Sequence, residues 1–100
     1  MITESSAVVV YHKGDRWAAD VPLGGQDHAF DHMRFIRRVL NEGVARYAGP
    51  FCRHDEHPSD DKIGLVVFNL PVHEVAQLIS EDPAVKGGLL APSIYAFYPL

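Results

Sequence analysis

The apolar residues of the chain form four short runs that are typical of β-strands. The run at residues 7–12 (AVVVYH) is rich in β-branched side chains, and residues 44–47 form a second, shorter run. Residues 63–68 (IGLVVF) are apolar at successive positions, which indicates a strand in the middle of a sheet. Residues 93–98 (SIYAFY) make an aromatic fourth strand. We therefore expect a four-stranded sheet.

Two further stretches repeat apolar residues at helical spacing. The first starts after Asp27, which we expect to be the N-cap, and ends at Gly43. The second follows Pro71 and ends at Asp82-Pro83, because the residue before a proline disfavours helical geometry. The apolar positions are Ala29, Phe30, Met33, Ile36 and Leu40 in the first helix and Val72, Val75, Ala76 and Ile79 in the second.

The resulting order, β-α-β-β-α-β, predicts an α+β fold of the ferredoxin-like type with one antiparallel sheet. A chain of 100 residues has room for a single core, so we assign residues 7–100 to one domain. Residues 1–6 are small and polar, and we expect them to be disordered. Residues 13–26 contain a proline and a Gly-Gly pair without periodicity, which predicts a long loop of the kind that often acts as a lid.

Composition narrows the classes of function. Nine basic and thirteen acidic residues give a net charge of −4 without any basic cluster, which argues against nucleic-acid binding. No apolar run approaches the roughly 18–20 residues that cross a bilayer, so we expect no membrane segment. The start lacks a basic leader region, and the single cysteine, Cys52, cannot form an internal disulfide. We expect a cytoplasmic protein.

The segment DHAFDH, residues 27–32, begins the first helix and contains two histidines. Because a helix turns by about 100° per residue, His32 falls on the apolar side between Ile36 and Val39, while Asp31 falls on the charged side. The segment is therefore mainly a charged helix start. His32 has two interpretations: a histidine at the edge of the core with one hydrogen bond, or a general acid–base in a cleft, since imidazole exchanges protons near neutral pH.

A metal site is a weaker alternative. His28 and His32 are four residues apart, a spacing that can place two imidazoles on one ion. Further ligands would have to come from residues 54–57 (HDEH), a stretch that is more simply a solvated turn. We therefore predict no metal and no organic cofactor.

Four more residues are candidates for contacts with a small-molecule substrate, together with His28. Tyr11 and His12 end the first strand, where side chains alternate between faces, so one should point into a cleft and the other pack under a helix. Arg16 and Trp17 in the long loop could close over a ligand, with the arginine binding a carboxylate. Each also has a simple structural explanation, as a surface charge or as an anchor for the loop.

Three motifs together resemble the YciI-like (YCII-related) family of the dimeric α/β-barrel superfamily. The first is a helix-one histidine followed by Asn41-Glu42-Gly43 and Ala48-Gly49-Pro50, and the second is the strand and helix at residues 63–79. The third is the stretch DPAVKGG at residues 82–88, which is close to the family's DP-x-V-x-x-G turn. The resemblance spans residues 7–99. One departure is that residues 26–31 are acidic and contain His28, where many relatives have a plainer Arg-x-x-His start.

The resemblance implies a homodimer in which two sheets face each other, and a His–Asp pair at the cleft. Counting back from Gly43, His32 falls at the family's histidine, and Asp82 falls at its Asp-Pro. Some members are implicated in lyase or dehydrochlorinase chemistry on aromatic or quinone-like compounds. We therefore expect a cofactor-independent lyase or isomerase that uses His32 and Asp82 on a small aromatic or carbonyl compound, in a cleft between sheet and loop. The alternative is a non-catalytic ligand-binding or regulatory dimer.

Overall fold

The computed structural model describes residues 6–55 and 61–100. The elements follow in the order β1 (Ser6–Lys13), η1 (Leu23–Gly25), α1 (Ala29–Asn41), β2 (Ala45–Pro50), β3 (Lys62–Phe68), α2 (Val72–Ile79), α3 (Pro83–Lys86) and β4 (Leu90–Phe97). Ser6 is buried and belongs to β1, which therefore starts one residue before the expected strand. Residues 1–5 of the segment expected to be disordered lie outside the described residues. No helix within the described ranges is long and apolar enough to cross a membrane.

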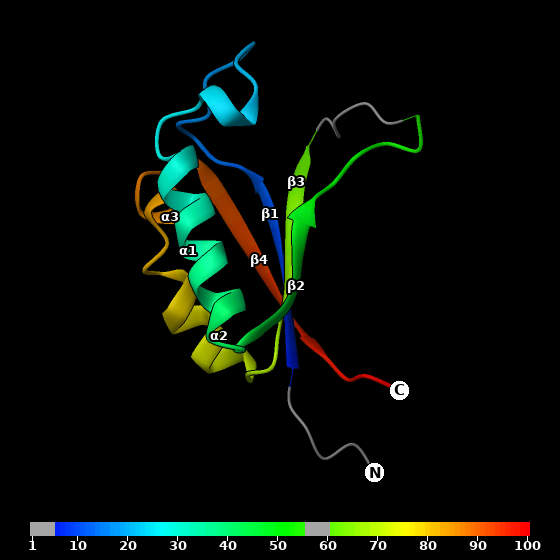
Figure 1. The fold of residues 1–100 in the computed structure, drawn as a ribbon. Coiled ribbons are helices and arrows are strands. Elements are labelled where there is room, and N and C mark those ends of the chain that lie inside the picture. The colour runs from blue at the N-terminus through cyan, green and yellow to red at the C-terminus, as the bar shows by residue number, and fades with distance from the viewer. Residues whose placement is uncertain (1–5, 56–60) are drawn as a thin grey trace.

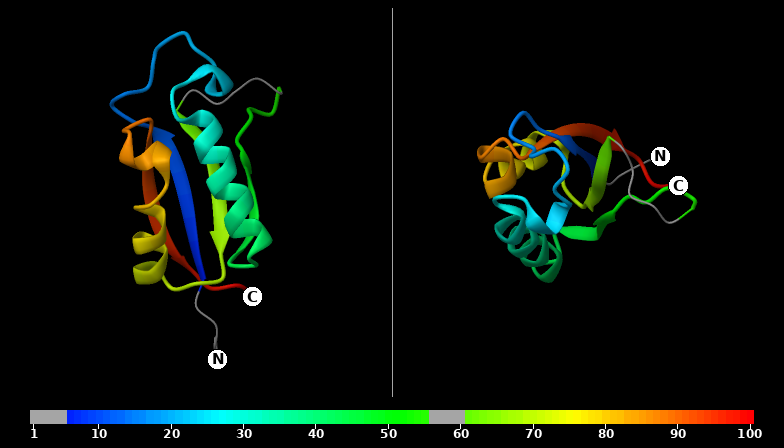
Figure 2. Two further views of the ribbon diagram at one scale, coloured as in Figure 1. Left: turned by 60° about the vertical axis from the view of Figure 1, so that its left-hand side comes forward. Right: turned by 90° about the horizontal axis from the view of Figure 1, so that it is seen from above.

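The four strands form one antiparallel sheet in the order β2-β3-β1-β4. β1 and β3 occupy its centre, where Val9 lies opposite Val66, and β4 pairs with the other edge of β1. The helices all cover the same face of the sheet, as Figures 1 and 2 show from three directions. This confirms the predicted ferredoxin-like βαββαβ fold.

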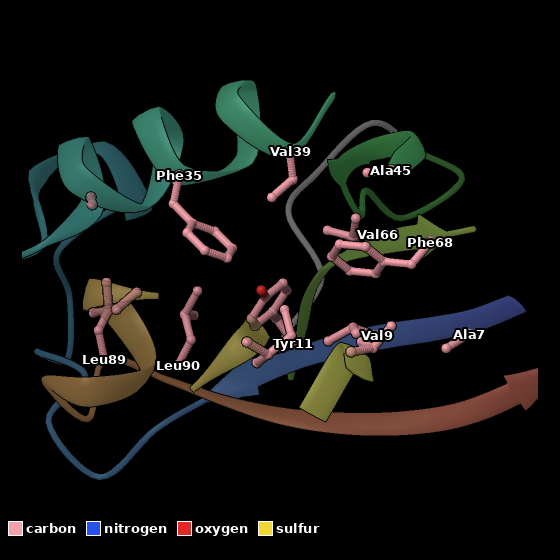
Figure 3. Packing of buried hydrophobic residues seen from close by; sticks show 14 residues of the cluster. Ala7, Val9, Tyr11, Phe35, Val39, Ala45, Val66, Phe68, Leu89 and Leu90 are labelled. Carbon is pink, nitrogen blue, oxygen red and sulfur yellow. The ribbon is translucent and has the colours of Figure 1, made fainter. Parts of the chain in front are cut away.

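The core lies between this covered face and the helices. Alternate residues of β1 and β3 point into it, because side chains of a strand alternate between the two faces. Phe35 and Val39 of α1 face these strands across the core (Figure 3), and Val75 and Ile79 of α2 belong to the same cluster. Each such side chain contributes about 1.5–3 kcal/mol when it is fully buried, so this layer holds the two helices on the sheet.

The opposite face of the sheet is apolar and has no helix over it. Val8, Val10, Leu65 and Val67 alternate with the core positions and are only half-buried. The register places three aromatic side chains on the same face, at Tyr47, Tyr95 and Phe97. No described element covers this surface, which we call the open sheet face.

α1 starts at a different residue from the one predicted, and it buries a different face. His28 is its N-cap, with a left-handed φ of 68°, and no side chain caps the helix, so the expected capping role of Asp27 is wrong. The buried face of α1 consists of Ala29, Phe35 and Val39. Phe30 and Met33 are exposed, although both were expected on the apolar face.

The second half of the chain contains a helix that the sequence did not predict. α2 ends at Ile79, and Asp82-Pro83 then starts the short helix α3, with Asp82 as N-cap and the proline in the first turn. Ala76 is exposed instead of facing inward. β4 begins at Leu90, earlier than expected, and β2 continues to Pro50.

Candidate active site

Asp82 is a buried carboxylate whose position is fixed by the start of α3. Its side chain is 0% exposed, and Oδ1 accepts a hydrogen bond of 2.9 Å from the backbone N–H of Ala84. Pro83 leaves no N–H of its own at the first helical position, so the cap bond goes to the next residue. The local sequence therefore holds one oxygen toward the helix and leaves Oδ2 for other donors.

His32 reaches this second oxygen from α1. Its Nδ1 lies 2.7 Å from Asp82 Oδ2, and the histidine side chain is 12% exposed. The predicted His32–Asp82 pair is therefore present, across 50 residues of sequence. This distance is short for a nitrogen–oxygen hydrogen bond, as is usual when the acceptor is charged.

Tyr11 is the third member of the cluster. Its hydroxyl projects from β1 toward α1 (Figure 3) and donates to Asp82 Oδ2 at 3.1 Å. The Tyr11 and His32 rings meet edge to face, with centroids 5.0 Å apart and an interplanar angle of 81°. Burial, followed by the negative charge of Asp82 and its hydrogen bond, raises the pKa of the Tyr11 phenol far above its ordinary value. Tyr11 is thus a neutral donor at every physiological pH.

These contacts fix the state of the imidazole. Tyr11 and Ala84 both donate to Asp82, so its carboxylate acts as an acceptor, and Nδ1 of His32 supplies the third donor. A buried carboxylate needs such partners, since each unpaired buried charge is costly. With the proton on Nδ1, Nε2 carries a free lone pair. Nε2 is therefore the nitrogen that can accept a proton from a ligand.

His32 lines a hollow of about 320 Å³ between α1 and the β2–β3 edge of the sheet, which we call the inner pocket. Most of its wall is apolar, and Arg37 supplies a positive charge. Gly64, which also lines the pocket, has no room for a side chain, because a Cβ there would lie 2.6 Å from the carbonyl oxygen of Gly49. Met33 also lines this pocket, which explains why a large apolar residue is 51% exposed.

The structure separates the other candidates from this cluster. His12 lies 3.3 Å from the carboxylate of Asp61, and Trp17 sits beneath the ammonium group of Lys13. Arg16 and His28 line a small polar hollow beside Gly87. His28 and His32 line different hollows, and no group of three or more metal-binding side chains occurs within the described ranges. Glu56 and His57, considered as ligands, lie outside the described residues.

The sequence indicated Tyr11 as a possible substrate contact but not as a partner of Asp82, and it did not single out Arg37. Tyr11 lines the inner pocket, and its hydroxyl donates to Asp82. The signal for Tyr11 was its inward position in β1, but the distance to Asp82 depends on tertiary packing. Arg37 also lines the inner pocket. A turn of about 100° per residue places Arg37 close to Met33 and away from Arg38, so the helical phase was a signal for its position.

Comparison with known proteins supports the fold. No family model matches the chain, and no curated protein sequence matches it. Among solved structures, it is similar to 5-chloro-2-hydroxyhydroquinone dehydrochlorinase (TftG) from Burkholderia phenoliruptrix AC1100, in complex with 2,5-dihydroxybenzoquinone. The match covers 91% of this chain and 92% of that one, with a TM-score of 0.61 and 19% sequence identity. At this identity the similarity shows a shared fold.

Proposed function

We propose that the protein is a small-molecule lyase or isomerase of the YciI type, in which His32 transfers a proton on an aromatic or carbonyl-containing substrate. The observation that carries the proposal is the 2.7 Å contact between His32 Nδ1 and the buried carboxylate of Asp82. His32 also lines the inner pocket. A base, an orienting carboxylate and a cavity for the reacting molecule are the parts that acid–base catalysis requires.

In the proposed step, Nε2 of His32 takes a proton from the substrate. The electron pair left behind forms a new double bond, and a leaving group departs with the electron pair of its own bond to carbon. Asp82 stabilises the imidazolium that results, and Tyr11 and Ala84 hold the carboxylate in place. Arg37 lines the same pocket and would stabilise negative charge that develops on a substrate oxygen.

The inner pocket suits a single small ring. Its volume of about 320 Å³ lies at the lower end of the range of ligand sites, about 300–1,000 Å³, and its wall is mostly apolar. The similar solved structure is a dehydrochlorinase whose named compounds are hydroxylated six-membered rings. Both points favour a hydroxylated aromatic or quinone-like substrate for this protein.

We also propose that the protein is a homodimer that pairs through the open sheet face. A sheet that is covered by helices on one side only leaves an apolar surface exposed to water. Here that surface includes Tyr95 and Phe97, which are 56% and 43% exposed. A second copy would bury it, whereas the inner pocket is lined by residues of α1, on the helix side of the sheet, and would stay accessible.

The proposed function is tested by turnover of a chlorinated hydroxyhydroquinone, measured as chloride release. We expect wild-type protein to release chloride and His32→Gln to be slower by at least about 100-fold, the usual contribution of a general acid–base. His73→Gln, which changes an exposed histidine of α2, is the matched control and should retain the wild-type rate. Equal rates for the two variants would refute the role of His32. Tight binding without turnover by wild type would favour the ligand-binding alternative.

A further inference from the structure

A second and larger hollow adjoins the inner pocket. It has a volume of about 530 Å³ and lies between the end of the sheet and the loop of residues 14–26; we call it the outer pocket. Leu23, Pro50 and Ile63 line both pockets, so the two hollows meet along these three apolar residues. The cleft that was expected between sheet and loop corresponds to this outer pocket.

The outer pocket has two cationic side chains. Lys13 is the last residue of β1 and Lys62 the first of β3, and both line it. Among the described residues of its lining, Asp20 is the one carboxylate, so these residues carry an excess of positive charge in a protein whose net charge is −4. Within residues 6–55 and 61–100, neither lysine forms an ion pair, and the Lys13 ammonium instead lies 5.4 Å from the ring centroid of Trp17. Both charges are therefore available to an anion.

The loop that closes the outer pocket is held in one shape by Gln26. This buried side chain accepts a hydrogen bond from the N–H of Ala18 and donates to the carbonyl oxygens of Ala18 and Val21. The start of the loop is tied to the body by Gly14, whose N–H donates to the carbonyl oxygen of Leu89. The apolar wall that Trp17 and its neighbours present is therefore built before a ligand arrives.

We infer that the outer pocket binds the carboxylate of an aromatic acid whose ring occupies the inner pocket. Two lysines that form no ion pair among the described residues line a pocket that also contains Trp17 and Phe51, and this combination fits a carboxylate on a flat apolar body. This inference rests on the proposed function, because it places the reacting ring beside His32. It also differs from the similar solved structure, since hydroxyhydroquinone and dihydroxybenzoquinone carry no carboxylate. Hydroxylated aromatic acids thus become the preferred substrates within the class of hydroxylated rings proposed above.

The test compares acids with their neutral esters. The probes are 2,5-dihydroxybenzoate and 2,5-dihydroxyphenylacetate, which hold the carboxylate at two distances from the ring, and the methyl ester of each. Binding is measured by calorimetry and by quenching of Trp17, the single tryptophan of the chain, which lines the outer pocket. Wild type should bind at least one acid about tenfold more tightly than its ester, as two partly exposed charge pairs allow.

The double variant Lys13→Gln/Lys62→Gln should lose this preference. Lys86→Gln, which changes the remaining lysine of the chain at an exposed position of α3, should keep it. Wild type that binds neither acid, or binds acids and esters equally, would overturn the inference, as would a double variant that still prefers acids. His32→Gln should retain the preference for acids, so a failure of the catalytic proposal is read separately, from turnover.

Discussion

Asp82 is the residue on which the site depends, and its three partners differ in how visible they are in the sequence. The bond from Ala84 follows from the local Asp-Pro-Ala order, which is typical of a helix start. The pair with His32 was expected from the family resemblance and from the position of His32 on the apolar side of its helix. The bond from Tyr11 spans 71 residues and depends on how β1 and α3 pack, which no local pattern specifies.

Tyr11 should make the stability of the protein sensitive to alkaline pH. The pKa of its phenol is raised in the folded state, so its stabilising effect is complete below the ordinary value of 10.0 and is lost as pH rises beyond it toward the folded value. Tyr11→Phe should remove this part of the decrease in the free energy of unfolding with rising pH. It should also lower the free energy of unfolding at pH 7 by about 1–3 kcal/mol, because Asp82 loses a donor.

Urea denaturation of wild type and Tyr11→Phe between pH 7 and pH 11 measures both effects. Tyr98→Phe changes an exposed tyrosine near the chain end and is the control, which should follow the wild-type curve. Lysines titrate in the same range, so the difference between variants is the quantity to compare. The assignment fails if Tyr11→Phe and wild type lose stability in parallel above pH 10.

At the scale of the elements, the strands and the two long helices could be predicted because each has a clear periodicity. The helix termini could not be predicted as well. α1 begins at a left-handed His28, where Asp27 had the better capping side chain, because His28 packs against the turn at Gly87. α3 has only four residues, Pro83–Lys86, too few to show a helical repeat. At His28 a tertiary contact outweighed local preference, whereas α3 was missed because of its length.

The C-terminal end of α1 gives a test at this scale. Gly43 has a φ of +77°, and a Cβ there would meet no atom within 4 Å, so the cost of a side chain is conformational alone. Gly43→Ala should lower the free energy of unfolding by about 1 kcal/mol. Gly24→Ala has equally open space without a left-handed φ, and should have no such cost. Thermal unfolding of both variants distinguishes them, and equal melting temperatures would contradict the explanation.

For the whole molecule, the arrangement of one covered and one open sheet face is the main consequence of the fold. The apolar residues at successive positions of residues 63–68 predicted a central strand, and β3 is indeed apolar on both faces. A cleft between sheet and loop was expected, but its division into two pockets could not be predicted, because they form where α1, the β2–β3 edge and the loop of residues 14–26 meet. Such a cavity depends on the distances between elements, which the pattern of single elements does not contain.

The proposed dimer predicts the mass of the particle in solution. Wild type should elute at micromolar concentration with twice the 11.1 kDa mass of one chain, measured by light scattering. Tyr95→Glu places a charge on the open sheet face and should give a monomer, because the charge would be buried between the sheets. Phe30→Glu makes the same kind of change on exposed α1 and should remain dimeric. A monomeric wild type would contradict the proposal.

The most direct measurement of the central claim is the tautomer of His32, determined from the nitrogen chemical shifts of its ring by NMR at a pH where the imidazole is neutral. The account predicts that Nδ1 carries the proton in wild type, because Asp82 accepts it at 2.7 Å, and that Nε2 is free. Asp82→Asn should shift the population toward a proton on Nε2. A wild-type His32 protonated on Nε2, or a tautomer unchanged by Asp82→Asn, would contradict the proposed catalytic pair.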